Sequence, residues 1–182
     1  MRRAVIFTLL ACLCLLGLAV AVGEREDESA DYGVLAQSAL RLADYHAATP
    51  LEVPGARTVS TPQLRRLLQT PVNERPLLFD VLGGDGHASL PGAIWLPDAG
   101  RGTSYQDALQ GRLAQALAAA TQRNPARPIA FFCAGPRCWL SYNAALRAVR
   151  LGYRNVMWYR GGIEAWGASG GALEPPRFVW NR

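Results

Sequence analysis

The chain has 182 residues, half of them hydrophobic, and a formal net charge of +5 at pH 7. This length and composition fit one domain with its own hydrophobic core and a short appendage. All 19 basic residues are arginines, scattered along the chain rather than clustered, so we expect no nucleic-acid partner.

The first 23 residues have the pattern of an export signal. Two arginines at positions 2 and 3 precede an apolar run over residues 4–22, and small residues at its end offer cleavage sites. The run is almost as long as the roughly 20 residues that cross a bilayer, so an uncleaved inner-membrane anchor is the alternative. We expect the folded part in the periplasm, touching the membrane only if this leader is retained.

The rest of the chain divides into a linker and a domain. Residues 24–31 are rich in charge and poor in apolar side chains, which predicts disorder. Leucines at helical spacing within residues 34–47 predict a short helix against the domain. We therefore expect a signal or anchor at 1–23, an acidic linker with a short helix at 24–43, and the folded domain at 44–182.

Strand and helix patterns alternate along the domain, which predicts a parallel sheet covered by helices on both faces. The predicted strands are 58–59, 76–81, 94–96, 129–132 and 155–158. The predicted helices run from an N-cap at Ser60 to about Gln69, from a cap at Ser104 with Asp107 in a capping-box position, from Ser141 to Gly152, and over 163–166.

Cys133 and Cys138 lie in the loop between the strand at 129–132, which we expect to be an inner strand, and the helix from Ser141. In parallel sheets the chemistry lies outside the carboxyl ends of the strands, where Cys133 falls. A helix N-terminus favours anions, and the thiolate is the reactive form of cysteine. The structural alternative is a buried strand that ends in two unreactive thiols.

Export also bears on the state of these thiols, because thiols outside the cytoplasm tend to be oxidised. Four residues separate the two cysteines, so a labile disulfide within the loop is sterically possible. We expect no metal, because His46 and His87 are the only histidines and neither has a ligand spacing to the cysteines.

Five motifs follow one another along the domain: Leu78-Phe-Asp-Val81, Leu90-Pro-Gly-Ala-Ile-Trp-Leu-Pro97, Phe132-Cys133, Gly152-Tyr-Arg-Asn-Val156 and Gly161-Gly-Ile-Glu-Ala-Trp166. In this order they resemble the rhodanese-like domain. More narrowly, other stretches are similar to exported rhodanese-like proteins that are associated with PQQ-dependent catabolism and named for a Cys–Cys–Trp motif. These stretches are Asp44-Tyr45, Val53-Pro-Gly55, Trp95-Leu-Pro97, Cys138-Trp139, Ser141-Tyr-Asn-Ala-Ala145 and Trp158-Tyr159.

The resemblance implies an α/β rhodanese-like fold, with a central parallel five-stranded sheet and helices on both faces. It places Cys133 at the position that carries a persulfide in active sulfurtransferases. We expect Cys133, held by the strand, to be the attacking thiol. Cys138 would be the resolving thiol, since its apolar neighbour Trp139 disfavours the thiolate. The substrate or anion loop would comprise Ala134, Gly135, Pro136, Arg137, Trp139 and Ser141, with its amides stabilising the charged sulfur.

The loop departs from the family pattern. Seven residues separate Cys133 from Ser141, more than is usual in the family, and Cys138-Trp139 stands where an arginine and a serine are expected. A second thiol and an indole that walls the pocket argue against simple thiosulfate chemistry. Related phosphatases need a phosphate-clamping arginine at the position of Trp139, so we expect no phosphatase activity.

Other residues have both a functional and a structural interpretation. Asp80 could be a general acid, but in this family it more often holds loops together. His87 could transfer protons, but its glycine-rich loop favours a solvated side chain. Arg147 and Arg150 are expected on a solvated helix face.

Three functions remain open. The first is a sulfurtransferase-like or thiol-redox enzyme that uses the two cysteines. The second is a non-catalytic accessory or maturation module that binds a periplasmic quinoprotein dehydrogenase or a c-type cytochrome. The third is a structural disulfide on a fold that has lost its chemistry. The link to PQQ follows from the resemblance alone, and no residue has the pattern of a PQQ ligand, so we expect no cofactor.

Overall fold

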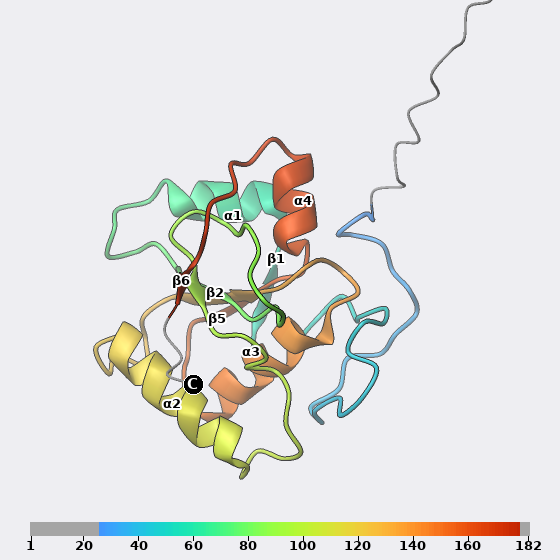
Figure 1. Ribbon diagram of the computed structural model, residues 1–182, viewed down its shortest axis with the longest axis vertical. Helices are drawn as coiled ribbons and strands as arrows, with labels where there is room; N and C mark the ends of the chain where they lie inside the picture. Colours follow the sequence, from blue (N-terminus) through green and yellow to red (C-terminus); the bar gives the residue numbers. More distant parts are fainter. Residues whose placement is uncertain (1–25, 179–182) are drawn as a thin grey trace, which may run out of the picture.

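The computed structural model describes residues 26–178 of the chain (Figure 1). The predicted leader at 1–23 lies outside these residues. Within the described part, no helix is both long enough and apolar enough to cross a membrane.

A sheet of six strands, paired in parallel throughout, forms the centre of the domain in the order β1-β5-β4-β2-β3-β6. The five expected strands are present, and a sixth, too short to leave a sequence pattern, extends the edge beside β3. All four residues of β4 are buried, and β4 lies between β5 and β2, which confirms it as an inner strand. The strands are β1 (Arg57–Val59), β2 (Leu77–Asp80), β3 (Ile94–Trp95), β4 (Ile129–Phe132), β5 (Val156–Tyr159) and β6 (Arg177–Phe178).

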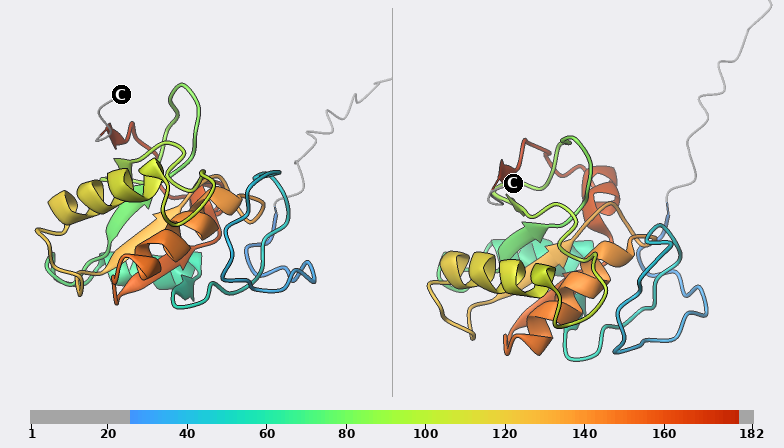
Figure 2. Two further views of the ribbon diagram at one scale, coloured as in Figure 1. Left: turned by 90° about the horizontal axis from the view of Figure 1, so that it is seen from below. Right: turned by 60° about the horizontal axis from the view of Figure 1, so that its bottom comes forward.

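Helices cover both faces of the sheet, as predicted (Figures 1 and 2). Those on one face pack on a core cluster that contains Phe79 and Phe131, and those on the other face pack on a second cluster that contains Phe132 and Leu64. The first face carries α2 (Ala108–Ala120) and α3 (Trp139–Arg150), and the second carries α1 (Thr61–Leu68) and α4 (Gly162–Ala168).

Two helix starts differ from the prediction. The N-cap of α2 is Asp107, not Ser104, because the Asp107 carboxylate accepts a hydrogen bond from the Gln110 N–H at 2.9 Å. Helix α3 begins at Trp139, two residues before Ser141, so that Cys138 is its N-cap residue. One of the two cysteines therefore belongs to the helix start itself.

The segment before β1, residues 26–56, is named the strap here, because it runs without a helix along the side of the domain that carries α3 (Figure 2). The predicted helix within 34–47 is wrong: the side chain of Leu35 is 87% exposed, and the backbone pairs with α3 instead. The Gln37 N–H donates to the Tyr142 hydroxyl at 2.8 Å. The predicted disorder is also wrong from residue 26 onward, because the acidic side chains there bind the domain.

Candidate active site

The loop that carries the two cysteines starts at the carboxyl end of β4 and ends at α3. The strap holds one side of it: the Trp139 N–H donates to the Tyr45 carbonyl at 2.9 Å, and the Thr49 hydroxyl donates to the Pro136 carbonyl at 2.6 Å. Both contacts come from residues that are distant in sequence. The loop is therefore fixed by the fold around it and not by its own length.

Helix α4 holds the other side of the loop. The N–H of Ile163 donates to the Cys133 carbonyl at 3.0 Å, and that of Glu164 to the Ala134 carbonyl at 2.9 Å. Gly162 makes this approach possible, because its φ is +59° and a β-carbon there would collide with the same two carbonyl groups. This explains why α4 begins with a glycine.

Cys133 and Cys138 are joined by a disulfide, with their α-carbons 6.3 Å apart. Each residue is only 1% exposed. The Ser141 hydroxyl accepts a hydrogen bond from the Trp158 Nε1–H at 3.0 Å. Its own hydrogen can point to the Cys138 carbonyl oxygen or to Cys133 Sγ, each 3.2 Å away. On reduction, this hydroxyl is placed to donate to a thiolate on Cys133.

Two backbone amides at the start of α3, one of them expected to stabilise the sulfur, are bonded to other groups. The Cys138 N–H donates to the Gly135 carbonyl at 3.1 Å, and the Trp139 N–H donates to Tyr45 of the strap. Neither can bind an anion without losing its present partner. The loop is therefore a poorer oxyanion receptor than its position at a helix start implies.

A cleft of about 540 Å³ opens beside the loop. Cys138 lines it, whereas Cys133 and Trp139 are not among the described residues that do. The predicted wall, Trp139, is 1% exposed and buried under the strap, where its Nε1–H donates to the Ala48 carbonyl at 3.0 Å. The residues that line the cleft are Glu26, His46, Ala134, Gly135, Arg137, Cys138, Glu164, Ala165 and Ala168.

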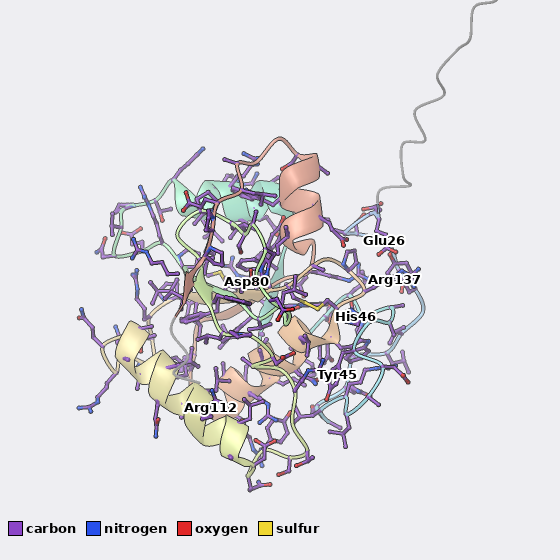
Figure 3. All side chains as sticks on the ribbon, viewed as in Figure 1. Glu26, Tyr45, His46, Asp80, Arg112 and Arg137 are labelled. Carbon is purple, nitrogen blue, oxygen red and sulfur yellow. A yellow bond between two sulfur atoms is a disulfide. The ribbon has the colours of Figure 1, made fainter. Side chains whose placement is uncertain are left out.

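Three charged side chains face this cleft. Arg137 pairs with Glu26, and its guanidinium also lies 4.9 Å from the centre of the Tyr32 ring. Figure 3 shows Glu26, Arg137 and His46 on one side of the molecule. The Glu164 carboxylate lies against the loop, so close that a β-carbon on Gly135 would collide with it. Desolvation, and then the charge of Glu26, raise the pKa of Glu164.

Asp80 and His87 lie together outside the cleft. Asp80 is fully buried; its carboxylate accepts the Leu82 N–H at 2.9 Å and the Ser89 hydroxyl, and it pairs with His87 Nε2 at 2.6 Å. The expectation of a solvated His87 is wrong, since its side chain is 18% exposed and its ring meets the edge of Trp95. The pair ties the loop after β2 to the end of that strand.

The expectation for Arg147 is also wrong, whereas Arg150 is exposed as expected. The side chain of Arg147 is fully buried and binds both carboxylate oxygens of Asp107, at 2.8 and 3.1 Å. The loop before α2 covers the face of α3 that carries Arg147. The sequence pattern predicted that this face would be exposed to solvent, but it is buried.

Of the three charged residues of the cleft, the sequence predicted Arg137 as a site residue but not Glu26 or Glu164. Glu164 could have been found, because it follows the glycine pair after β5, the strand next to β4, and the carboxyl ends of neighbouring parallel strands meet at one edge. Glu26 and His46 left no such signal, because the strap brings them to the loop from residues more than 80 positions earlier in the chain.

Comparison with known proteins gives a family and a fold. The family described as the rhodanese-like domain matches residues 60–169. A thiosulfate sulfurtransferase from Pseudomonas aeruginosa is similar in structure, with a TM-score of 0.52 and 20% identity, over 71% of this chain but only 22% of that chain. A polysulfide-sulfur transferase homodimer from Wolinella succinogenes has a TM-score of 0.48 and 17% identity, over 68% of this chain and 81% of that one. A rhodanese-like domain from Anabaena has a TM-score of 0.47 and 21% identity, over 64% and 77%. No curated protein matches the chain.

Proposed function

Because the chain belongs to the rhodanese-like domain family, we propose that it performs thiol chemistry at the Cys133–Cys138 pair, as thiol–disulfide exchange or persulfide sulfur transfer. The observation that carries the proposal is a disulfide inside the family's active-site loop, with one of its cysteines on a cleft. A disulfide that served only to staple the fold would not need to adjoin an opening.

The exchange proceeds in two displacements. An external thiolate attacks Cys138 Sγ, the new S–S bond forms as the Cys133–Cys138 bond breaks, and Cys133 leaves as a thiolate next to the Ser141 hydroxyl. A second external thiolate then attacks the mixed disulfide, which releases the oxidised small molecule and leaves the dithiol. In sulfur transfer, the Cys138 thiolate takes the outer sulfur of a sulfane-sulfur donor, whose remaining sulfur leaves as a thiolate. The Cys133 thiolate then attacks the inner sulfur of the Cys138 persulfide, which releases hydrosulfide and closes the disulfide.

This order differs from the prediction that Cys133 attacks first. Only Cys138 of the pair is among the described residues that line the cleft, so we assign external exchange to Cys138 and keep Cys133 as its buried partner. By microscopic reversibility, the sulfur that an incoming thiol attacks is also the one that attacks an incoming disulfide.

The test is reaction of single-cysteine variants with glutathione disulfide under native conditions, followed by intact mass. We expect Cys133→Ser to form the mixed disulfide at least about tenfold faster than Cys138→Ser, since Cys133, which the latter variant keeps, is not among the described residues that line the cleft. Faster reaction of Cys138→Ser would restore the original assignment. If the wild-type disulfide is reduced only after unfolding, the pair is structural and the proposal fails.

We also propose that the protein is exported and acts beside a periplasmic PQQ-dependent oxidation system. The leader pattern and the disulfide support export, because stable disulfides are uncommon in the cytoplasm. The Cys138-Trp139 motif supports the narrower family. A non-catalytic accessory module would bind the same class of partner, a quinoprotein dehydrogenase or c-type cytochrome, without needing reactive thiols.

Fractionation and pull-down separate these possibilities. We expect the periplasmic protein to begin after residue 21 or 23, and N-terminal sequencing that found Met1 on membrane-bound protein would support the anchor instead. A quinoprotein or cytochrome recovered equally with wild type and with a Cys133→Ser/Cys138→Ser double variant would favour the accessory module, because that contact would not depend on the thiols.

A further inference from the structure

The charges around the cleft are unequal. Arg137 and Glu26 compensate each other as an ion pair, and His46 is the other basic side chain at the opening. Glu164 stands apart: among residues 26–178, no basic side chain forms an ion pair with its carboxylate. An incoming molecule therefore meets one uncompensated negative charge next to the disulfide.

The position of Glu164 makes this charge relevant to the sulfur. Its carboxylate contacts Gly135, three residues before Cys138, and its backbone N–H is bonded to the Ala134 carbonyl at 2.9 Å. The charge is thus held against the loop by the first turn of α4. The amides of Cys138 and Trp139 do not offset it, because they are already bonded, to Gly135 and to Tyr45.

From this arrangement we infer that the cleft selects thiols with positive or no charge beside the sulfur, and disfavours thiosulfate and other anionic sulfur compounds. Glu164 is the specificity-determining residue. This inference rests on the proposed thiol exchange at Cys138, since it concerns which nucleophile reaches that sulfur. It also gives a physical reason for the expectation that simple thiosulfate chemistry is absent.

The charge acts on the first displacement. Every external thiolate carries the same negative charge on its sulfur as it approaches Cys138 Sγ. The rates for two thiols therefore differ through the charge of the substituent beside the sulfur. An ammonium group is attracted by the Glu164 carboxylate and a second carboxylate is repelled. For unit charges about 4 Å apart in water, each effect is about fivefold in rate, and salt screens it.

The test compares two small thiols, cysteamine and 3-mercaptopropionate, as reductants of the folded, oxidised full chain. Rate constants are measured by quenching with an alkylating agent and intact mass, and divided by the thiolate fraction of each reagent. The quantity compared is the cysteamine to mercaptopropionate rate ratio in wild type, in Glu164→Gln and in Glu74→Gln. Because both reagents are measured on each protein, their intrinsic difference in reactivity cancels when the ratios of the three proteins are compared.

Glu74→Gln is the matched control, because it removes the same charge from an exposed residue before β2, at the edge of the sheet opposite the cysteine loop. We expect the ratio to fall at least about fivefold in Glu164→Gln, to stay at the wild-type value in Glu74→Gln, and to shrink in wild type as salt is added.

Two results would overturn the inference and leave thiol exchange standing. One is an unchanged ratio in Glu164→Gln, and the other is an equal fall in both variants, which would indicate an effect of net charge alone. If neither thiol reduces the folded protein at any concentration, the proposed function fails and the inference fails with it.

Discussion

The ion pair between Asp107 and Arg147 illustrates how one residue can do two tasks. Asp107 caps α2, and its carboxylate also accepts hydrogen bonds from both terminal nitrogens of the fully buried Arg147 guanidinium on α3. Burial alone would raise the pKa of Asp107, but the Arg147 hydrogen bonds and the backbone N–H groups of Gln110, Ser104 and Thr103 lower it far below its ordinary range. The charged form is therefore favoured by folding.

This pair predicts a pH-dependent loss of stability in Asp107→Asn, which keeps a good capping side chain but removes the charge. A carboxyl whose folded pKa is depressed contributes stability above its unfolded pKa of about 3.9, and loses it as the pH falls toward the folded value. We expect the variant to be about 3 kcal/mol less stable at neutral pH, with the gap beginning to close as the pH falls below about 4 and narrowing further at lower pH. Urea unfolding at several pH values measures this.

Asp98→Asn is the control for that experiment. Asp98 also pairs with an arginine, Arg101, but its side chain is 41% exposed. A pair so exposed contributes little, so we expect its variant to lie within about 0.5 kcal/mol of wild type at every pH. A gap for Asp107→Asn that persisted unchanged at low pH would assign its cost to packing rather than to charge.

The strap is the element that completes the candidate site, and its anchors are charged. Arg160, 2% exposed, donates to the backbone carbonyls of Glu28 and Thr49 at 2.7 and 3.0 Å. The Glu28 carboxylate in turn accepts the Thr61 N–H and hydroxyl, at 2.8 and 2.9 Å, at the first turn of α1. The acidic start of the strap thus binds a helix N-terminus, where negative charge is favoured.

We expect Glu28→Gln to loosen the start of the strap. A carboxylate at a helix N-terminus is worth about 0.3–1 kcal/mol, so the amides of residues 26–32 should exchange hydrogen about two- to fivefold faster, as measured by mass spectrometry. Glu52→Gln, at an exposed strap position, should leave the exchange unchanged. Equal exchange in both variants would show that Glu28 does not hold the segment.

The sequence predicted the sheet and helices far better than the strap, for a physical reason. Each strand and helix has a local hydrophobic pattern, such as the unbroken apolar run of Ile129–Phe132, and the folded structure buries the residues that the pattern marks. The leucines within 34–47 share a helical spacing, but the backbone there is satisfied by Tyr142 and Asn143 of α3, more than 100 residues away. A local sequence pattern cannot predict hydrogen-bond partners that are so distant in the chain.

The candidate site follows the same division. Its cysteines and Ser141 lie at the predicted junction of strand, loop and helix, because these three are consecutive in the chain. Its cleft also contains Glu164, the residue proposed to set specificity, and Glu26, and only the fold brings these two to the cysteine loop. The burial of Arg147 could not be predicted for a related reason, because the loop that covers it has no repeating sequence pattern.

At the scale of the whole molecule, charge is divided between the strap and the rest. Residues 26–56 contain six carboxylates and one arginine, whereas residues 57–178 contain seven carboxylates and 14 arginines. An acidic segment therefore lies on a basic body. The family match begins only at residue 60, so one wall of the cleft is supplied by a part of the chain that the match does not cover.

The distant partners of the strap also set an order of folding. The strap has no helix of its own, and its hydrogen bonds to Tyr142, Asn143 and Arg160 join residues 102 to 132 positions apart, so it docks only once α3 and the end of β5 have formed. We therefore expect the sheet and its helices to assemble first, leaving the cysteine loop open on the side that Tyr45 and Thr49 later cover. The oxidant that joins Cys133 to Cys138 would act on this open intermediate, and docking of the strap would then close the newly formed bond away from solvent.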